Sequence, residues 1–281
     1  RIPRKDSDKL SRNLILSHAV ATGAALPEEV TRAAMLVRAN TLVKGYSGVR
    51  QELVQTLVDM LNKGVTPVIP EQGSLGSSGD LSPLSHLALV FTTDADDRLE
   101  DSGWAKFNGN IMRGKDAMDA AGTTRIVLGP KEGLATINGA TFSAAIGALA
   151  VEDAHQLLII ANHALAMSLE AMMGCSSAYD PRLHRARGQR GQIHIADAVL
   201  QLIEGSTFVD GAHRVQDAYS LRCAPQVHGA AVDTLAFVES VIQAEINAAT
   251  DNPLIFDPGI AISGGNFHGE LLLRFPYGFH R

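Results

Sequence analysis

The sequence predicts a mainly α protein, a long up-and-down helical bundle with an N-terminal domain that carries a Gly/Ser-rich loop. Apolar residues recur at the spacing of one helix face through most of the 281 residues. From residue 132 onward the chain is rich in alanine, and segments that look like strands are few. Aromatic residues make up only 5% of the chain, so long helices are expected to pack through alanine and leucine.

Three helices are expected in the first 64 residues. The first covers residues 10–22. Pro27 begins the second, because proline suits the first helical position, and this helix runs towards Gly45. Ser47 is the expected N-cap of the third helix, which Gly64 ends.

The character of the sequence changes at residue 65. Residues 65–70 contain two prolines and are expected to be extended. The segment GSLGSSGD follows at residues 73–80, and an apolar helix begins near Leu81. Residues 94–122 are polar and are expected to form a surface excursion. Longer helices are expected over residues 140–173, 193–203 and 230–249.

The length allows about two domains of ordinary size. We expect an N-terminal domain over residues 1–130, which contains the loop, and a central helical bundle over residues 131–281. Hydrophobic residues make up 46% of the chain, which is enough for a sizeable core and excludes disorder as the main state.

Charge and cysteine content exclude several functional classes. The chain has 24 Lys and Arg against 30 Asp and Glu, a net charge of −6, and no basic cluster, so no nucleic-acid partner is expected. Cys175 and Cys223 form no CxxC pair, which fits a reducing, cytoplasmic compartment. Histidines such as His184, His194 and His228 show no ligand spacing, so no metal site is expected.

One stretch, residues 133–151, carries no charged residue and is long enough to span a bilayer. Threonine, asparagine and serine interrupt it, and no Trp or Tyr marks its ends. We therefore predict a helix that enters a protein core, and no membrane partner.

The Gly/Ser segment at residues 73–80 permits several interpretations. A flexible linker rarely lies between a proline-rich extended segment and an apolar helix. A phosphate-binding loop would need a GK[ST] ending or GxGxxG spacing, and the segment has neither. A structural turn fits the composition as well as a chemical interpretation does.

The chemical interpretation concerns the triplet Ser77-Ser78-Gly79. Because glycine has no side chain, the amide nitrogen of Gly79 can approach the carbonyl carbon of Ser77. Ring closure with loss of water, then dehydration of Ser78, would give a methylidene-imidazolone, an electrophile made from the chain itself. No ordinary side chain is electrophilic, so an enzyme that needs such a group has to build or borrow it.

Seven blocks of the sequence then resemble one known family. They are LILSHAVATG at residue 14, KGYSGVR at 44, PVIPEQGSLGSSGDLSPLSHLAL at 67, KEGLATING at 131, VQDAYSLRCAPQVHG at 215, DNPLIF at 251 and SGGNFHGE at 263. Together, and in this order, they resemble the aromatic amino acid ammonia-lyase and aminomutase family over nearly everything from Leu10 to Glu270. SHA after LIL, GQRGQI at residue 188 and QDAYSLRC are most similar to members that act on histidine.

The resemblance implies a non-oxidative deamination, most simply of L-histidine to urocanate and ammonia. It implies a methylidene-imidazolone formed autocatalytically from Ser77, Ser78 and Gly79, with no external cofactor. The electrophile would capture the substrate amine and make it a better leaving group. Tyr46 would take the β-proton, and because a phenol is a weak base at neutral pH, this role needs neighbours that favour the phenolate.

Further roles carry over from the resemblance. Arg222 corresponds to the clamp for the substrate carboxylate, which suits its planar fork. Asn138 and Tyr219 correspond to polar residues that contact the substrate or the modified ring, and Asp80 to a residue that helps ring closure. The remaining pocket positions are Gln216, Phe267 and the pair Ser17-His18, the pair being placed at the substrate's side-chain ring.

Taken singly, several of these residues have ordinary structural explanations. Tyr46 could be a packed turn residue, Arg222 an ion-pair partner and His18 a buried core histidine. Asn138 could cap a helix. Only their occurrence together with the Ser-Ser-Gly loop favours an active site.

The sequence also departs from the family pattern. Ser77 stands where alanine is commoner, the segment before Leu10 is short, and LLLRFPYGFHR after Glu270 does not resemble the helix expected there. We therefore expect an incomplete chain whose full-length protein is a homotetramer with active sites built from several subunits. An aminomutase or ammonia-lyase for tyrosine or phenylalanine, and an inactive helical fragment, stay open as alternatives.

Overall fold

The computed structural model describes residues 7–76, 78–270 and 272. The chain divides into two compact units, and each is described by itself. The first lies within residues 1–149 and 241–281, and the second comprises residues 150–240. The structure is mainly helical with a few short sheets, which confirms the predicted fold class. The division into domains at residue 130 stays a prediction.

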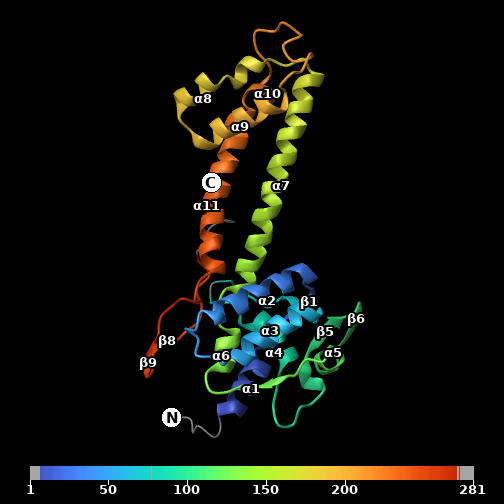
Figure 1. Ribbon diagram of the computed structural model, residues 1–281, viewed down its shortest axis with the longest axis vertical. Helices are drawn as coiled ribbons and strands as arrows, with labels where there is room; N and C mark the ends of the chain where they lie inside the picture. The colour runs from blue at the N-terminus through green and yellow to red at the C-terminus, as the bar shows by residue number, and fades with distance from the viewer. Residues whose placement is uncertain (1–6, 77, 271, 273–281) are drawn as a thin grey trace. The chain divides into compact units, whose positions relative to one another are not determined.

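The first unit is a group of helices around α4 (Figure 1). Helix α4 is almost wholly buried, because its sequence LSPLSHLALVF has no charged residue and α1, α5 and α6 pack against it. The helices that begin in this unit are α1 (Ser7–His18), α2 (Glu28–Val43), α3 (Gln51–Lys63), α4 (Leu81–Phe91), α5 (Gly114–Ala120), α6 (Glu132–Ile137) and α7 (Thr141–Ala171).

Local signals place the early helices well, with corrections at their ends. Helix α1 ends at His18, before the predicted end at residue 22, and Thr22 instead begins β1 (Thr22–Ala25), which pairs with β3 (Pro70–Gln72). Pro27 is the N-cap of α2 instead of its first helical residue. The N-cap prediction for Ser47 is wrong, since a turn intervenes and Arg50 caps α3. Gly64 ends α3 in the left-handed region, as predicted.

The prediction of a surface excursion over residues 94–122 is also wrong. This segment forms β5 (Trp104–Phe107), β6 (Asn110–Arg113) and α5, and β5 pairs with β2 (Thr66–Pro67). Polar residues cover its outer side, whereas Ala105, Ala117 and Met118 enter the core. The remaining short elements are β4 (Thr92–Thr93), η2 (Glu100–Ser102), β7 (Ile126–Val127), β8 (Leu254–Asp257) and β9 (Ile260–Ile262).

The second unit packs short helices around parts of two long ones. Its elements are most of α7 and of α11 (Ala224–Ile246), together with η3 (Ser176–Tyr179), α8 (Pro181–Arg187), α9 (Arg190–Leu202) and α10 (Tyr219–Arg222). Its small core includes Leu169, Tyr179, Ile195 and Val199. Helices α7 and α11 lie side by side (Figure 1), and His155 Nε2 lies 3.3 Å from a carboxylate oxygen of Glu239.

The apolar stretch from residue 133 contributes to the core of the first unit. The segment Glu132–Ala171, which holds α6 and α7, is the one helical segment among the described residues that is long and apolar enough to cross a membrane. In its most apolar window 61% of the residues are buried inside the protein. This degree of burial is typical of a core helix, as the sequence predicts.

Arg38 of α2 joins three segments inside the first unit. Its side chain is wholly buried, and it donates to the carbonyl oxygens of Ala135 at 2.5 Å and Asn138 at 2.7 Å. A third hydrogen bond, of 3.3 Å, reaches Thr141 Oγ1 at the start of α7. Burial lowers the pKa of Arg38 to about 10, so the guanidinium remains charged at neutral pH. Arg38 therefore fixes the junction of α6 and α7.

We expect Arg38→Leu to destabilise the protein by about 3 kcal/mol, because two buried carbonyl groups lose their donors. Urea unfolding measures the change. Arg32→Leu is the matched control on the same helix, since Arg32 is half-buried and donates to one carbonyl, that of Leu61, at 3.1 Å. It should cost about 1 kcal/mol or less. Equal losses for the two variants would contradict the role of Arg38.

Candidate active site

The Gly/Ser loop connects β3 to α4 and is held at its C-terminal end. Ser77 lies outside the described residues, Ser78 is exposed and Gly79 is buried. Gly79 has a φ of +87°, and a Cβ there would lie 3.2 Å from both the nitrogen and the oxygen of Gly139. Only glycine fits this backbone and this close approach. The loop is therefore pressed against the segment that follows α6.

Asp80 fixes the loop from inside. Its side chain is buried and accepts hydrogen bonds from Ser74 Oγ at 2.6 Å and from the backbone nitrogen of Ser143 at 2.9 Å. Its own backbone nitrogen donates to the carbonyl oxygen of Gly139 at 2.8 Å. Burial raises the pKa of Asp80, and the hydrogen bonds from Ser74 and Ser143 oppose that shift. Asp80 thus ties both ends of the loop to the start of α7.

Asn138 lies directly beside this contact. It is the C-cap residue of α6, and its backbone N–H donates to the carbonyl oxygen of Leu134. The backbone of Asn138 therefore caps the helix, and its side chain is used elsewhere. Its side-chain Nδ2 donates to Asp251 Oδ1 at 3.2 Å and to the carbonyl oxygen of Asn252 at 3.4 Å. The structure therefore brings Asn138, Gly79 and Asp80 together.

Tyr46 occupies the turn between α2 and α3. Gly45 precedes it with a φ of +82°. The Tyr46 ring packs on Phe256 of β8 with 5.5 Å between ring centroids, and its carbonyl oxygen accepts from the nitrogen of Ile255 at 2.8 Å. Within the described residues the Tyr46 hydroxyl makes no hydrogen bond. The ring is held in place and the hydroxyl is free to act on a ligand.

Ser17 and His18 end helix α1. Ser17 Oγ and His18 Nδ1 lie 3.0 Å apart, and both contact the carbonyl oxygen of Leu14. Ser17 is exposed and His18 half-buried. His18 is therefore not the buried core histidine that its helix alone would favour.

Phe267 belongs to a segment that lies against the loop. Its ring stacks on that of His268 with centroids 4.9 Å apart. Two residues further on, a Cβ at Gly269 would come within 2.3 Å of the carbonyl oxygen of Gly76. The first unit thus places Phe267 near the N-terminal half of the loop.

Gln216, Tyr219 and Arg222 belong to the second unit. Gln216 and Tyr219 are exposed, and the Arg222 guanidinium lies over the Tyr219 ring, 4.3 Å from its centroid. Arg222 Nε is buried without a hydrogen-bond partner among the described residues, and no carboxylate there lies within ion-pair distance of Arg222. The ordinary explanation of Arg222 as an ion-pair partner is therefore not met in that part of the chain.

Several residues that hold these positions escape sequence reasoning. Asp217 is buried and accepts from the nitrogen of Cys175 at 2.6 Å, which anchors the segment before α10. Asp251 accepts from Asn138 and pairs with Lys131, and Arg38 donates to the Asn138 carbonyl oxygen. Of these residues only Asp251 adjoins an asparagine, Asn252, and no local pattern identifies the partners, which lie far away in the sequence.

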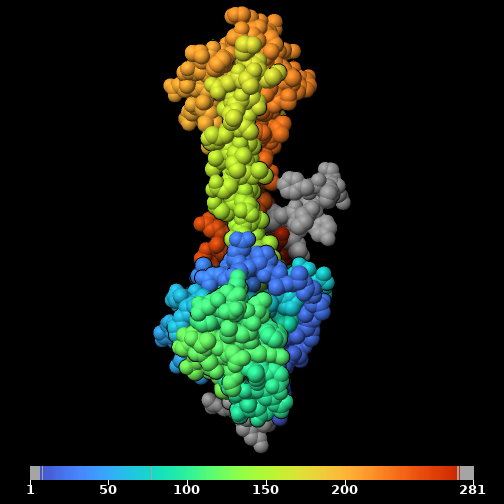
Figure 2. Space-filling model, turned by 90° about the vertical axis from the view of Figure 1, so that its right-hand side faces the viewer, coloured from blue at the N-terminus to red at the C-terminus, as the bar shows by residue number. Residues whose placement is uncertain are grey.

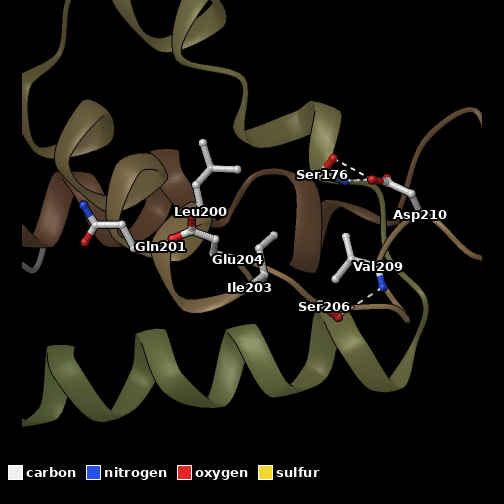
Figure 3. Close-up of a pocket in the computed structure, with 8 residues that line it drawn as sticks. All are labelled: Ser176, Leu200, Gln201, Ile203, Glu204, Ser206, Val209 and Asp210. Carbon is white, nitrogen blue, oxygen red and sulfur yellow. Dashed lines mark hydrogen bonds between the residues drawn. The ribbon is translucent and has the colours of Figure 1, made fainter.

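Two other features of the described residues were candidates for a competing site. Among the described residues no three His, Cys, Asp or Glu side chains are arranged to hold a metal ion. His184 is buried and receives a hydrogen bond from Gln192 at 2.8 Å. A hollow of about 460 Å³ in the second unit contains none of the predicted site residues, and the carboxylate of Asp210 in it is already bound to Ser176 (Figure 3).

Comparisons with known proteins agree with this arrangement. The family model described as aromatic amino acid lyase matches residues 1–273. Histidine ammonia-lyase of Alkaliphilus oremlandii is 52% identical over 272 residues, which is 96% of this chain and 52% of that protein. The enzyme of the same name from Clostridium tetani is 50% identical over 280 residues, 99% of this chain and 53% of that protein. The chain therefore spans about half the length of these curated relatives.

Solved structures give the same result. Histidine ammonia-lyase from Trypanosoma cruzi has a TM-score of 0.86 at 39% identity, covering 97% of this chain and 50% of that one. Phenylalanine aminomutase of Pantoea agglomerans has a TM-score of 0.89 at 30% identity, covering 96% of this chain and 54% of that one.

Proposed function

Because the chain belongs to the aromatic amino acid lyase family, we propose that the protein removes ammonia from L-histidine and releases urocanate. The observation that carries the proposal is the loop: Ser78 is exposed, while Gly79 is locked against Gly139 in a conformation that only glycine adopts easily. The identity of about half the residues to histidine ammonia-lyases favours histidine as the substrate.

The electrophile is proposed to form from the chain itself, with no external cofactor. The amide nitrogen of Gly79 attacks the carbonyl carbon of Ser77, and the carbonyl oxygen leaves as water with the amide hydrogens of Gly79 and Ser78. A second water takes the Ser78 hydroxyl and its α-hydrogen, which leaves a methylidene. Two structural facts fit this group: Gly79 has no side chain to obstruct the approach, and Asp80 anchors the loop from within. The methylidene captures the substrate amine and turns it into a better leaving group.

The other residues are assigned roles in the same reaction. Tyr46, whose hydroxyl makes no hydrogen bond to the residues that the structure describes, takes the β-proton. Arg222, whose guanidinium lies over the Tyr219 ring, binds the carboxylate through its fork of donors. Tyr219 and Gln216 supply further polar groups to the substrate. Asn138 contacts the substrate or the modified ring from beside the loop.

Ser17 and His18 are assigned to the side-chain ring of the substrate. Both can hydrogen-bond an imidazole, whereas a bare phenyl ring would leave their polar groups unpaired. Phe267 is assigned to the same substrate pocket.

A homotetramer with shared active sites is proposed for the full-length protein. Helix α7 exposes a row of apolar side chains, and in Figure 2 its outer face, drawn in yellow-green, is open to view. Leu157, Ile160 and Met167 are each more than 60% exposed, which is unusual for large apolar residues and typical of an interface. The low cysteine content and net charge of −6 support a cytoplasmic location.

Incubation with L-histidine tests the substrate assignment. The protein as its gene encodes it should produce urocanate, which is followed by its absorbance, with L-tyrosine and L-phenylalanine turned over at least about a hundredfold less efficiently. Absence of urocanate from folded protein with a processed loop would contradict the histidine assignment. An intact mass without the loss of two water molecules would show an unprocessed loop and would favour the alternative of an inactive fragment.

An aminomutase or ammonia-lyase for phenylalanine or tyrosine is the second candidate. The high structural similarity to phenylalanine aminomutase of Pantoea agglomerans favours it. An aminomutase would return ammonia to the β-carbon, so chromatography of the products for β-amino acids separates it from the proposed lyase. A phenylalanine or tyrosine ammonia-lyase is separated by the amino acid that it deaminates.

A further inference from the structure

Three polar side chains form a buried network beside the loop. Asp251 is 1% exposed. Its Oδ2 binds Lys131 Nζ at 2.5 Å, and its Oδ1 accepts from Asn138 Nδ2 at 3.2 Å. Lys131 lies immediately before α6 and Asn138 immediately after it. Asp251 therefore connects both ends of one short helix.

The network dictates which way the Asn138 amide faces. Nδ2 points at two groups, the carboxylate of Asp251 and the carbonyl oxygen of Asn252. Both are acceptors, so only the NH₂ group of Asn138 can occupy that side. The amide oxygen of Asn138 makes no hydrogen bond within the residues that the structure describes. It is therefore the atom left to accept a hydrogen bond from elsewhere.

The ion pair between Lys131 and Asp251 stabilises this orientation of the Asn138 amide. A buried carboxylate without a cation carries a large desolvation cost and tends to take up a proton. Lys131 Nζ contacts the carboxylate directly, and Arg38 adds a favourable electrostatic interaction with it. These two cations compensate the buried charge of the Asp251 carboxylate, whose oxygens face Lys131 and Asn138.

The oriented amide lies next to the electrophile-bearing loop. Gly139, the neighbour of Asn138, accepts from the backbone nitrogen of Asp80 at 2.8 Å. The same glycine limits the space around Gly79. The Asn138 side chain is therefore only one residue away from the backbone that contacts the loop.

We propose that Lys131 and Asp251 are positioning residues that hold the Asn138 amide with its oxygen free to accept a hydrogen bond from an N–H donor of the bound amino acid. This inference rests on the proposed function, in which Asn138 contacts the substrate. Neither residue touches the substrate in this scheme, since both act through Asn138.

A double-mutant cycle tests it in the protein as its gene encodes it. Asp251→Asn keeps the shape but presents an amide, which no longer dictates the orientation of Asn138. It should lower kcat/KM for histidine about tenfold in the wild-type background, and less than about twofold when Asn138→Ala is already present. A merely structural role would lower kcat/KM by the same factor in both backgrounds, and that result would overturn the proposal.

Two further variants complete the double-mutant cycle. Lys131→Met removes the cation and keeps the apolar stem. Its effect on kcat/KM should depend on Asn138 in the same way, so the test does not rely on the folding of Asp251→Asn. Lys115→Met is the matched control, because Lys115 forms an ion pair of 2.7 Å with Asp97 away from the loop. It should leave kcat/KM unchanged, and a tenfold loss there would overturn the assignment. The intact mass of each variant checks that the loop is processed.

A readout without turnover separates this inference from the proposed function. In protein with ¹⁵N-labelled asparagine, the side-chain amide protons of Asn138 should exchange slowly, and at least about tenfold faster in Asp251→Asn. Unchanged exchange would overturn the positioning role even in an active enzyme. If no amino acid is deaminated, the proposed function fails, and the exchange rates still decide the orientation of Asn138.

Discussion

Ser78→Ala is expected to abolish deamination, with kcat/KM for histidine falling by about a thousandfold or more. Alanine has no β-hydroxyl to lose, so the methylidene cannot form whatever happens at Gly79. Ser78 is exposed and makes no side-chain hydrogen bond within the described residues. The free energy of unfolding should therefore change by less than about 0.5 kcal/mol. Urocanate formation and intact mass measure the two consequences, and the variant should retain at least one of the two waters.

Ser168→Ala is the control for this substitution. It removes the same hydroxyl from an exposed position of α7, where Oγ bonds only to the carbonyl oxygen of Ala164 in the same helix. Both waters should still be lost and activity should be unchanged. Wild-type activity in Ser78→Ala would refute the proposed electrophile, because no other residue of the triplet carries the atoms of the methylidene.

Signals that act within a few residues made much of the fold predictable. Gly64 stops α3 because it adopts the left-handed conformation directly after the helix. The apolar run from Leu81 forms a helix as soon as the loop ends. Ser47 shows the limit of such signals: it has the chemistry of an N-cap, yet the turn around Tyr46 is completed by Gly48, and α3 begins only after Arg50.

The supports of the candidate site were not predictable in the same way. Arg38 and Asn138 are 100 positions apart, and Asn138 and Asp251 are 113 apart. No periodicity links such residues, because their contact depends on how α2 and the segment after α11 pack on the junction of α6 and α7. The sequence indicates Asn138 only through resemblance to a family, and the resemblance does not reveal what orients its amide.

Tyr46→Phe is expected to lower kcat for histidine about 10²- to 10⁴-fold, the usual contribution of a general base. The change removes one oxygen atom and keeps the ring that packs on Phe256 at 5.5 Å between centroids. Because the Tyr46 hydroxyl has no hydrogen-bond partner among the described residues, stability should change by less than about 0.5 kcal/mol. Steady-state kinetics and urea unfolding measure both effects, and the mass should still show the loss of two waters.

Ser47→Ala separates loss of the base from disturbance of the turn. It deletes one oxygen from the adjacent residue, and Ser47 Oγ is buried without a hydrogen-bond partner among the described residues. Removing an unsatisfied buried hydroxyl should leave kcat unchanged and slightly stabilise the protein. A similar loss of kcat in both variants would mean that the turn, and not the phenol, matters. If Tyr46→Phe kept more than about a third of the wild-type kcat with its loop processed, the β-proton would have to be taken by another group.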